Sequence, residues 1–286
     1  MDKQYADNIS ELIDKAVLGN KKALETLLMG VHDLIFNLSL RMLGTVPDAE
    51  DATQEIMIRI MTHLATFRKE SSFSTWAFRI ASNHLKDYKK NFFAKYPLSF
   101  EYYGSDILEG KAKDIEDLSQ NIEQSILAQE LKLSCTNVML QCLDTESRCI
   151  FILGTMFKVD SRVAGDILNI SSETYRQRLS RIRKKVAAFL DKYCELSGKG
   201  PCRCSNRVQY AIESRRIDPA NLEYFHLEES QEILLFDCTE AMEEIDGIAN
   251  VFSDLPAYKA TDNARAFLTN FLQSESYRKI ENAKIS

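Results

Sequence analysis

The 286-residue sequence contains few of the residues that interrupt regular structure, with 5 prolines and 10 glycines. No apolar run approaches the roughly 18 residues that a membrane span requires, and residues 1–7 lack the apolar stretch of a secretion signal. Because 45% of the residues are hydrophobic and 27% are charged, disordered and fibrous classes are excluded. We therefore expect a helix-rich globular protein that stays in the cytoplasm, without membrane insertion.

Cysteine is present in an odd number, seven residues spread over the chain. This distribution argues against a disulfide framework and favours reduced thiols. Cys202 and Cys204 have the Cys-x-Cys spacing that can contribute to a zinc or copper site, with a remote Cys238 or His226 completing it. The alternative is that both are reduced thiols in a capped turn. Zinc is thus the one cofactor that the sequence suggests.

No Ser-His-Asp set, phosphate-binding loop or paired-carboxylate pocket is recognisable in the sequence, so we expect no enzymatic activity. The net charge is −6, which by itself is unfavourable for binding a polyanion. The charge is unevenly distributed, however: residues 1–90 sum to 0, residues 91–130 to −5, residues 131–200 to +5 and residues 201–286 to −6. A nucleic-acid interface is therefore expected to be local. Six basic side chains lie within ten residues of one another: Arg176, Arg178, Arg181, Arg183, Lys184 and Lys185.

Apolar residues recur at helical spacing through most of the chain, which predicts an all-α fold. We expect two helices between residues 9 and 43, a helix at about 48–67 and another at about 74–90. Residues 96–130 contain Pro97, Gly104 and Gly110 with many acids, and we interpret them as a mobile acidic linker that becomes helical near Ile122.

The second half of the chain is also expected to be helical. Residues 131–190 are interrupted only at 169–171. An apolar stripe predicts a helix at about 230–252, and Thr261 and Asp262 are suited to cap a last helix.

The break at 169–171 has the chemistry of a helix-turn-helix. Gly165 would let two helices cross closely, Asn169 can adopt the left-handed conformation, and Ser171 can cap the second helix. The first two turns of that helix are where base edges in a major groove are met, while later arginines are placed for phosphates. The candidate DNA-binding residues are Ser172, Glu173, Tyr175, Arg176, Gln177, Arg178 and Arg181.

Two strings earlier in the chain resemble region 2 of the extracytoplasmic-function sigma factors of the sigma-70 family. The first is DAEDATQE at residues 48–55, and the second is FSTWAFRIASN at residues 73–83, followed by Asp87. Residues 143–190 are similar to region 4 of the same family. The resemblance covers about two thirds of the chain, and the minimal family form has no counterpart to the remainder.

The resemblance implies roles for two helices. Asp51, Gln54, Glu55 and Arg59 match the helix that contacts the clamp helices of core RNA polymerase. A second set matches the helix that faces the −10 element of promoter DNA, where an extruded base requires hydrogen-bonding and stacking surfaces. Its members are Trp76, Arg79, Asn83 and Lys86, of which Trp76 is alternatively a partly buried core residue.

The sequence departs from the family pattern at Met57, Gly165 and Glu173. The first two are packing changes, whereas Glu173 can accept a hydrogen bond from cytosine, so the −35 sequence recognised is expected to be unusual.

The resemblance implies region 2 over residues 1–95, the linker at 96–130 and region 4 at 131–193. The remaining residues, 194–286, are expected to form a helical C-terminal extension with a regulatory role, because the charge of −6 on residues 201–286 is opposite to the +5 on residues 131–200. It implies promoter-specific transcription initiation, with core RNA polymerase and promoter DNA as partners and an anti-sigma factor as a further candidate. The alternative is a helix-turn-helix regulator that acts without polymerase.

Overall fold

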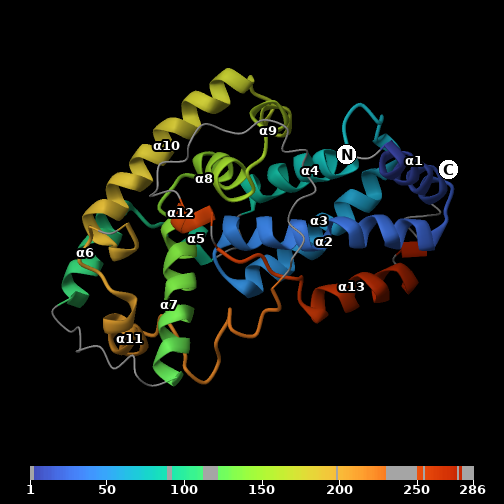
Figure 1. Ribbon diagram of the computed structural model, residues 1–286. Helices are drawn as coiled ribbons and strands as arrows, with labels where there is room; N and C mark the ends of the chain where they lie inside the picture. Colours follow the sequence, from blue (N-terminus) through green and yellow to red (C-terminus); the bar gives the residue numbers. More distant parts are fainter. Residues whose placement is uncertain are drawn as a thin grey trace.

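The computed structural model describes residues 3–88, 92–111, 122–197, 199–229, 250–253, 255–275 and 277–278. These residues form helices and connecting turns, with two isolated bridges and no strand among them, so the all-α prediction is confirmed. Figure 1 shows the helices arranged as two neighbouring groups, with C-terminal segments along one side.

The N-terminal group is a helical bundle whose helices are capped by side chains. Asn20, Thr45 and Ser72 each accept a hydrogen bond from a backbone N–H of the first turn that follows, which satisfies donors that have no partner inside the helix. The elements are α1 (Lys3–Val17), α2 (Lys21–Leu43), α3 (Val46–His63), η1 (Leu64–Thr66) and α4 (Phe73–Asp87).

Helix α2 is the central element of this bundle. Contrary to the sequence estimate, it is long and apolar enough by composition to cross a membrane, but 72% of its most apolar window is buried inside the protein. It packs against α1, α3 and α4. Its apolar character is therefore accounted for by its central position.

The segment expected to be an acidic linker contains a helix that was not predicted, whereas the helix predicted to begin near Ile122 does begin there. Helix α5 (Phe92–Lys95) ends just before this segment, α6 (Phe100–Lys111) lies inside it, and α7 (Ile122–Leu140) begins inside it. The two glycines lie inside α6 and serve close packing: a Cβ on Gly104 would stand 2.5 Å from the Tyr193 ring, and one on Gly110 would stand 2.1 Å from Nη2 of Arg207. At these two positions glycine lets side chains from distant parts of the sequence pack against α6. It is not there to make the segment flexible.

The second group contains the predicted helix-turn-helix. Asn169 has φ +57° and ends the first helix, a Cβ on Gly165 would stand 2.7 Å from the carbonyl oxygen of Ile170, and Ser171 caps the second helix. All three local expectations are confirmed. The elements are α8 (Thr145–Phe151), η2 (Ile152–Met156), α9 (Ser161–Leu168), α10 (Ser172–Tyr193) and η3 (Glu195–Ser197).

The two groups share one hydrophobic core. Phe78 of α4 meets Phe157 edge to face at 5.8 Å between ring centroids. Arg148 is buried and donates from Nη1 to the carbonyl oxygen of Met42 at 2.5 Å, which joins α8 to the end of α2. The two groups of helices thus pack against each other through this core and are also joined by a hydrogen bond.

The described part of the C-terminal extension consists of α11 (Cys204–Glu213), α12 (Asn250–Ser253), α13 (Asp262–Gln273) and their connections. Helix α11 packs on α7, and α13 packs on α3. The last helix begins at Asp262, as its capping sequence predicts. The helix expected at 230–252 lies outside the described residues, except for its final residues at 250–252.

Three buried polar groups hold the extension to the other helices. Asn37 donates from Nδ2 to the carbonyl of Tyr258 at 2.6 Å and accepts from its N–H at 2.9 Å. Arg41, 2% exposed, donates to Asn137 and to the carbonyl of Pro256. The third group, the carboxylate of Glu130, accepts the backbone N–H groups of residues 223–225.

Candidate nucleic-acid interface

Helix α3 presents a polar face opposite its buried face. The side chains at Asp51 and Arg59 are exposed, and those at Gln54 and Glu55 are half-buried. We call these four residues the α3 face. The helix buries the opposite side because its apolar residues recur at helical spacing. The buried residues of α3 are Ala49, Ala52, Thr53, Ile56, Met57, Ile60 and Met61.

Two residues border the α3 face: His84 of α4, and Tyr88 directly after that helix. Nε2 of His84 lies 3.3 Å from Oε2 of Glu55. Burial raises the pKa of Tyr88 to about 12, and the nearby carboxylates of Glu55, Asp51 and Asp48 add to the effect. Tyr88 therefore keeps its proton at neutral pH, and the α3 face carries an acidic potential.

The four residues predicted on α4, which we call the α4 face, differ in exposure. Arg79 and Asn83 are exposed, whereas Lys86 is half-buried. Trp76 is half-buried between the rings of Phe67 and Phe73, at centroid distances of 5.3 and 5.9 Å. Trp76 thus contributes to packing and still keeps part of its ring at the surface.

Helix α10 has an exposed polar face formed by Glu173, Arg176, Gln177 and Arg181, which we call the α10 face. Ser172 and Arg178 lie beside it and are half-buried. Several of these side chains bind protein groups here: Arg176 donates to Ser161 at 3.1 Å, Gln177 to Glu173 at 3.4 Å and Arg178 to Glu146 at 2.5 Å. These bonds must be exchanged if the same groups are to bind DNA.

Two sequence expectations on α10 require correction. Tyr175 is fully buried and its hydroxyl donates to the carbonyl of Ile150 at 3.3 Å, so it packs the helix and cannot meet a base edge. Arg183, expected near phosphates, is half-buried and donates to Thr155 at 3.1 Å and to the carbonyl of Gly154 at 2.9 Å. Both side chains point inward because α10 packs on α8 along this side.

The α4 face lies against the helix-turn-helix. Nε of Arg79 donates to the carbonyl oxygen of Asp166 at 3.1 Å. A groove between the two elements is lined by Arg79, Asn83, Asp166, Asn169 and Ser171, among others. Sequence reasoning treated the two modules separately and missed this contact, for which no local pattern gives a signal.

The described residues around Cys202 and Cys204 do not form the expected zinc site, and the version of that site completed by Cys238 lies outside the described residues. Among the described residues, no three His, Cys, Asp or Glu side chains are placed to hold a metal ion. His226 is exposed and lies beside Phe225, while Cys238 is outside the described residues. Burial raises the pKa of the Cys204 thiol, which disfavours the thiolate that binds metal.

Comparison with known proteins covers the helices that carry the α3 and α4 faces. Residues 27–91, which span α2 to α4, match the Sigma-70 region 2 family. The chain is 29% identical over 178 residues to the ECF RNA polymerase sigma factor SigW of Bacillus subtilis, an alignment that covers 62% of this chain and 94% of that protein.

Two further relatives are also RNA polymerase sigma factors. RNA polymerase sigma factor CnrH of Cupriavidus metallidurans is 27% identical over 195 residues, which are 67% of this chain and 97% of the relative. The ECF RNA polymerase sigma-E factor of Escherichia coli K12 is 32% identical over 88 residues, 31% of this chain and 44% of the relative. The two longer alignments use nearly the whole of each relative and leave about a third of this chain unmatched.

Proposed function

Because the chain belongs to the extracytoplasmic-function sigma factors of the sigma-70 family, we propose that its three polar faces divide the work of promoter-specific transcription initiation. The α3 face binds core RNA polymerase, the α4 face binds the −10 element and the α10 face binds the −35 element. The observation that carries the assignment of the first two faces is the family match over residues 27–91, because it spans both α3 and α4. The α10 assignment is supported by the helix-turn-helix geometry at Gly165, Asn169 and Ser171.

The α3 face suits a protein partner. Its exposed acidic and basic side chains stand on a rigid helix whose other side is fully packed, so binding would require little rearrangement. The partner in this proposal is the clamp of core polymerase. An anti-sigma factor that kept the protein inactive would have to cover this same face.

The α4 face suits an opened DNA strand. Arg79 and Lys86 supply positive charge, Asn83 supplies a hydrogen-bonding edge, and the exposed part of the Trp76 ring supplies a stacking surface. An extruded base is recognised through these two kinds of contact. The protein supplies recognition, and the polymerase supplies the chemistry, in the cytoplasm.

The α10 face suits a major groove. Arg176 can bind guanine through two hydrogen bonds and Gln177 can bind adenine in the same way, while Glu173 can accept from cytosine. All three project from the first two turns of α10, which follow the tight turn at Asn169. Arg181 stands further along the helix, where phosphates are met.

The packed arrangement of α4 on α9 implies a conformational change in this proposal. The −10 and −35 elements are about 25 base pairs apart, or about 85 Å at 3.4 Å per base pair of duplex. Helices in direct contact cannot reach both elements at once. We therefore propose that the contact between Arg79 and Asp166 is released when the protein binds polymerase.

A pull-down of core RNA polymerase by the purified full-length chain tests the proposal. Retention of core polymerase supports it. The competing function, a helix-turn-helix regulator that acts without polymerase, predicts duplex binding by the free chain and no retention of core enzyme. That result would overturn the proposal.

A further inference from the structure

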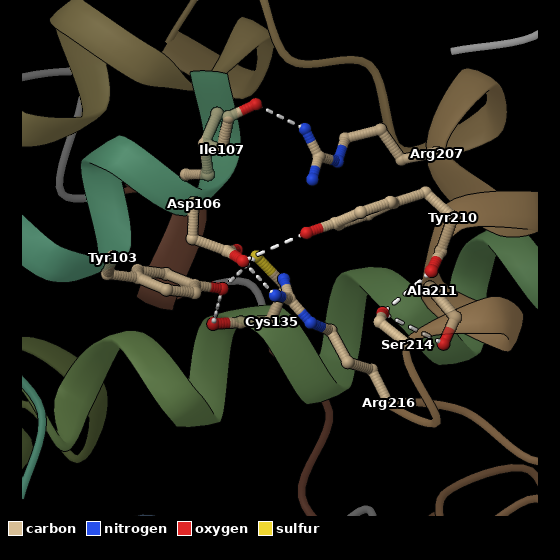
Figure 2. A network of polar contacts seen from close by, with 9 residues as sticks. All are labelled: Tyr103, Asp106, Ile107, Cys135, Arg207, Tyr210, Ala211, Ser214 and Arg216. Carbon is tan, nitrogen blue, oxygen red and sulfur yellow. Dashed lines mark hydrogen bonds and ion pairs between the residues drawn. The ribbon is translucent and has the colours of Figure 1, made fainter. Parts of the chain in front are cut away.

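A cavity of about 560 Å³ lies where the extension meets the rest of the protein. Most of its walls come from α6, α7, α11 and the segment that follows α11, and the turn between α2 and α3 and the α5 region complete them with Gly44, Thr45, Phe93 and Leu98. Figure 2 shows the polar side chains of this region, with Asp106 and Tyr103 on α6, Cys135 on α7, and Arg207, Tyr210 and Arg216 contributed by the extension. The volume lies within the range typical of small-molecule sites.

Arg207 is a buried cation with an unused donor. The residue is 5% exposed, and Nη1 donates to the carbonyl oxygen of Ile107 at 2.5 Å. Nη2 is buried and, among the described residues, has no hydrogen-bond partner. In Figure 2 this nitrogen points away from Ile107, toward the space between Asp106 and Tyr210. A buried guanidinium is costly unless an anion compensates it.

Asp106 supplies a hydrogen-bond acceptor that complements the unused donor of Arg207. Its Oδ1 is bonded to Arg216 and accepts from the Tyr210 hydroxyl at 3.0 Å. Oδ2 is buried and lacks a hydrogen-bond partner within the described part of the chain. A buried polar atom that is left unsatisfied costs free energy, so a group that donates to it would be bound favourably.

The Tyr210 ring fixes the two arginines around the cavity. The guanidinium of Arg207 lies 4.7 Å from the ring centroid and that of Arg216 lies 5.1 Å from it. Cation–π contacts of this kind hold a guanidinium in place without neutralising its charge. The site is therefore already formed before any ligand arrives.

We propose that this cavity binds a small organic acid that also carries an N–H or O–H donor, the chemistry of an amino acid or a hydroxy acid. The carboxylate accepts from Nη2 of Arg207, and the donor group binds Oδ2 of Asp106. Apolar residues of the cavity wall, Ile107, Leu131 and Ile217, contact the remainder of the ligand. The inference rests on these contacts alone and does not depend on the proposed role in transcription.

The position of the cavity gives the ligand a structural consequence. Asp106 belongs to α6, whereas Arg207 belongs to the extension, and one ligand bridging them would tie the two together. Helix α6 in turn packs on the C-terminal half of α10, where Tyr103 stacks on Phe189 at 5.9 Å. A bound acid is thus expected to stabilise the packed arrangement of the extension, α6 and α10.

The test is calorimetric titration of the full chain with each free L-amino acid and with lactate and malate, with the corresponding amides as ligands that lack the carboxylate. We expect at least one acid to bind and its amide to bind at least ten-fold more weakly. Arg207→Met should weaken that acid about ten- to a hundred-fold, and Arg207→Lys less. Arg203→Met, which removes an exposed arginine from the same segment, is the matched control and should bind as the unmodified chain does.

Asp106→Asn keeps an acceptor for Tyr210 and replaces the free acceptor with a donor, so it should also weaken the acid, even if Arg207→Met fails to fold. Failure of every acid in the panel to bind the unmodified chain would overturn the proposal. Equal binding of the acid by Asp106→Asn and the unmodified chain would overturn it as well.

Discussion

Nε of Arg79 on α4 donates to the carbonyl oxygen of Asp166 on α9 at 3.1 Å, so the helix assigned to the −10 element is bonded to the helix-turn-helix assigned to the −35 element. The ring of Phe78 on the same helix packs against the Phe157 ring. The α4 face therefore lies against the first helix of the helix-turn-helix in this structure. Separation of α4 from α9 is the step that the proposed function requires.

Charge reversal on the α3 face should abolish polymerase binding. Asp51→Lys combined with Glu55→Lys introduces two positive charges where the partner meets two carboxylates, and both side chains are outside the core, so the fold should persist. Retention of core polymerase is the measurement, with helical circular dichroism to confirm folding. Glu25→Lys combined with Glu70→Lys makes the same change in net charge elsewhere and should bind normally. Unchanged binding by the first variant would refute the α3 assignment.

Arg176→Ala and Arg181→Ala should have different effects on −35 recognition by the holoenzyme. Loss of a base contact at Arg176 should cost about 1–3 kcal/mol and relax sequence preference at one position. Loss of a phosphate contact at Arg181 should weaken binding to all DNA sequences equally. It should also lower the number of counterions released on binding by about one, so that binding depends less steeply on salt concentration. Binding measured on matched and mutated −35 sequences over a salt series separates the two. A uniform loss for Arg176→Ala would assign it to a phosphate.

Glu130→Ala should loosen the extension. The buried carboxylate accepts the N–H groups of Glu223, Tyr224 and Phe225, at 2.7 Å for the first of these, and its removal leaves these donors without partners. We expect a loss of about 2–3 kcal/mol in the free energy of unfolding, measured in urea, and faster proteolysis near residue 224. Gln129→Ala, at an exposed neighbouring position, is the control. Equal stability of the two variants would contradict the role given to Glu130.

Alkaline pH should destabilise the protein through a buried thiol. Burial raises the pKa of Cys149 from an ordinary 9.0 to about 11, so its contribution to stability is fully present below pH 9 and is lost as the pH rises to about 11. The loss from this one thiol should be about 2 kcal/mol. Urea unfolding below pH 9 and near pH 11, with Cys149→Ala for comparison, measures it. If the stability of Cys149→Ala fell by the same amount between the two pH values, Cys149 would not be the cause of the alkaline destabilisation.

The elements predicted correctly from sequence are those whose cause is local. The turn between α9 and α10 depends on Gly165, Asn169 and Ser171, which lie within seven residues, so their chemistry could be interpreted directly. The residues of the α3 face were indicated by the string at residues 48–55, whose members are likewise close in the chain. In both cases the residues that define the feature are neighbours in the chain.

The features missed depend on partners far away in the chain. Gly104 and Gly110 suggest flexibility until Tyr193 and Arg207 are seen packed against them. Arg41 shows no sign in the sequence of a partner 215 residues later. The inward orientation of Tyr175 is likewise set by its contact with Ile150 on α8.

Run-off transcription with purified core RNA polymerase on a library of genomic fragments shows directly whether this chain directs promoter-specific initiation. The account predicts discrete transcripts from a small set of fragments that share −10 and −35 sequences, present with the full-length chain and absent with core enzyme alone. The same transcripts should be lost with the Asp51→Lys, Glu55→Lys variant. Transcription that is indistinguishable with and without the chain would contradict the account.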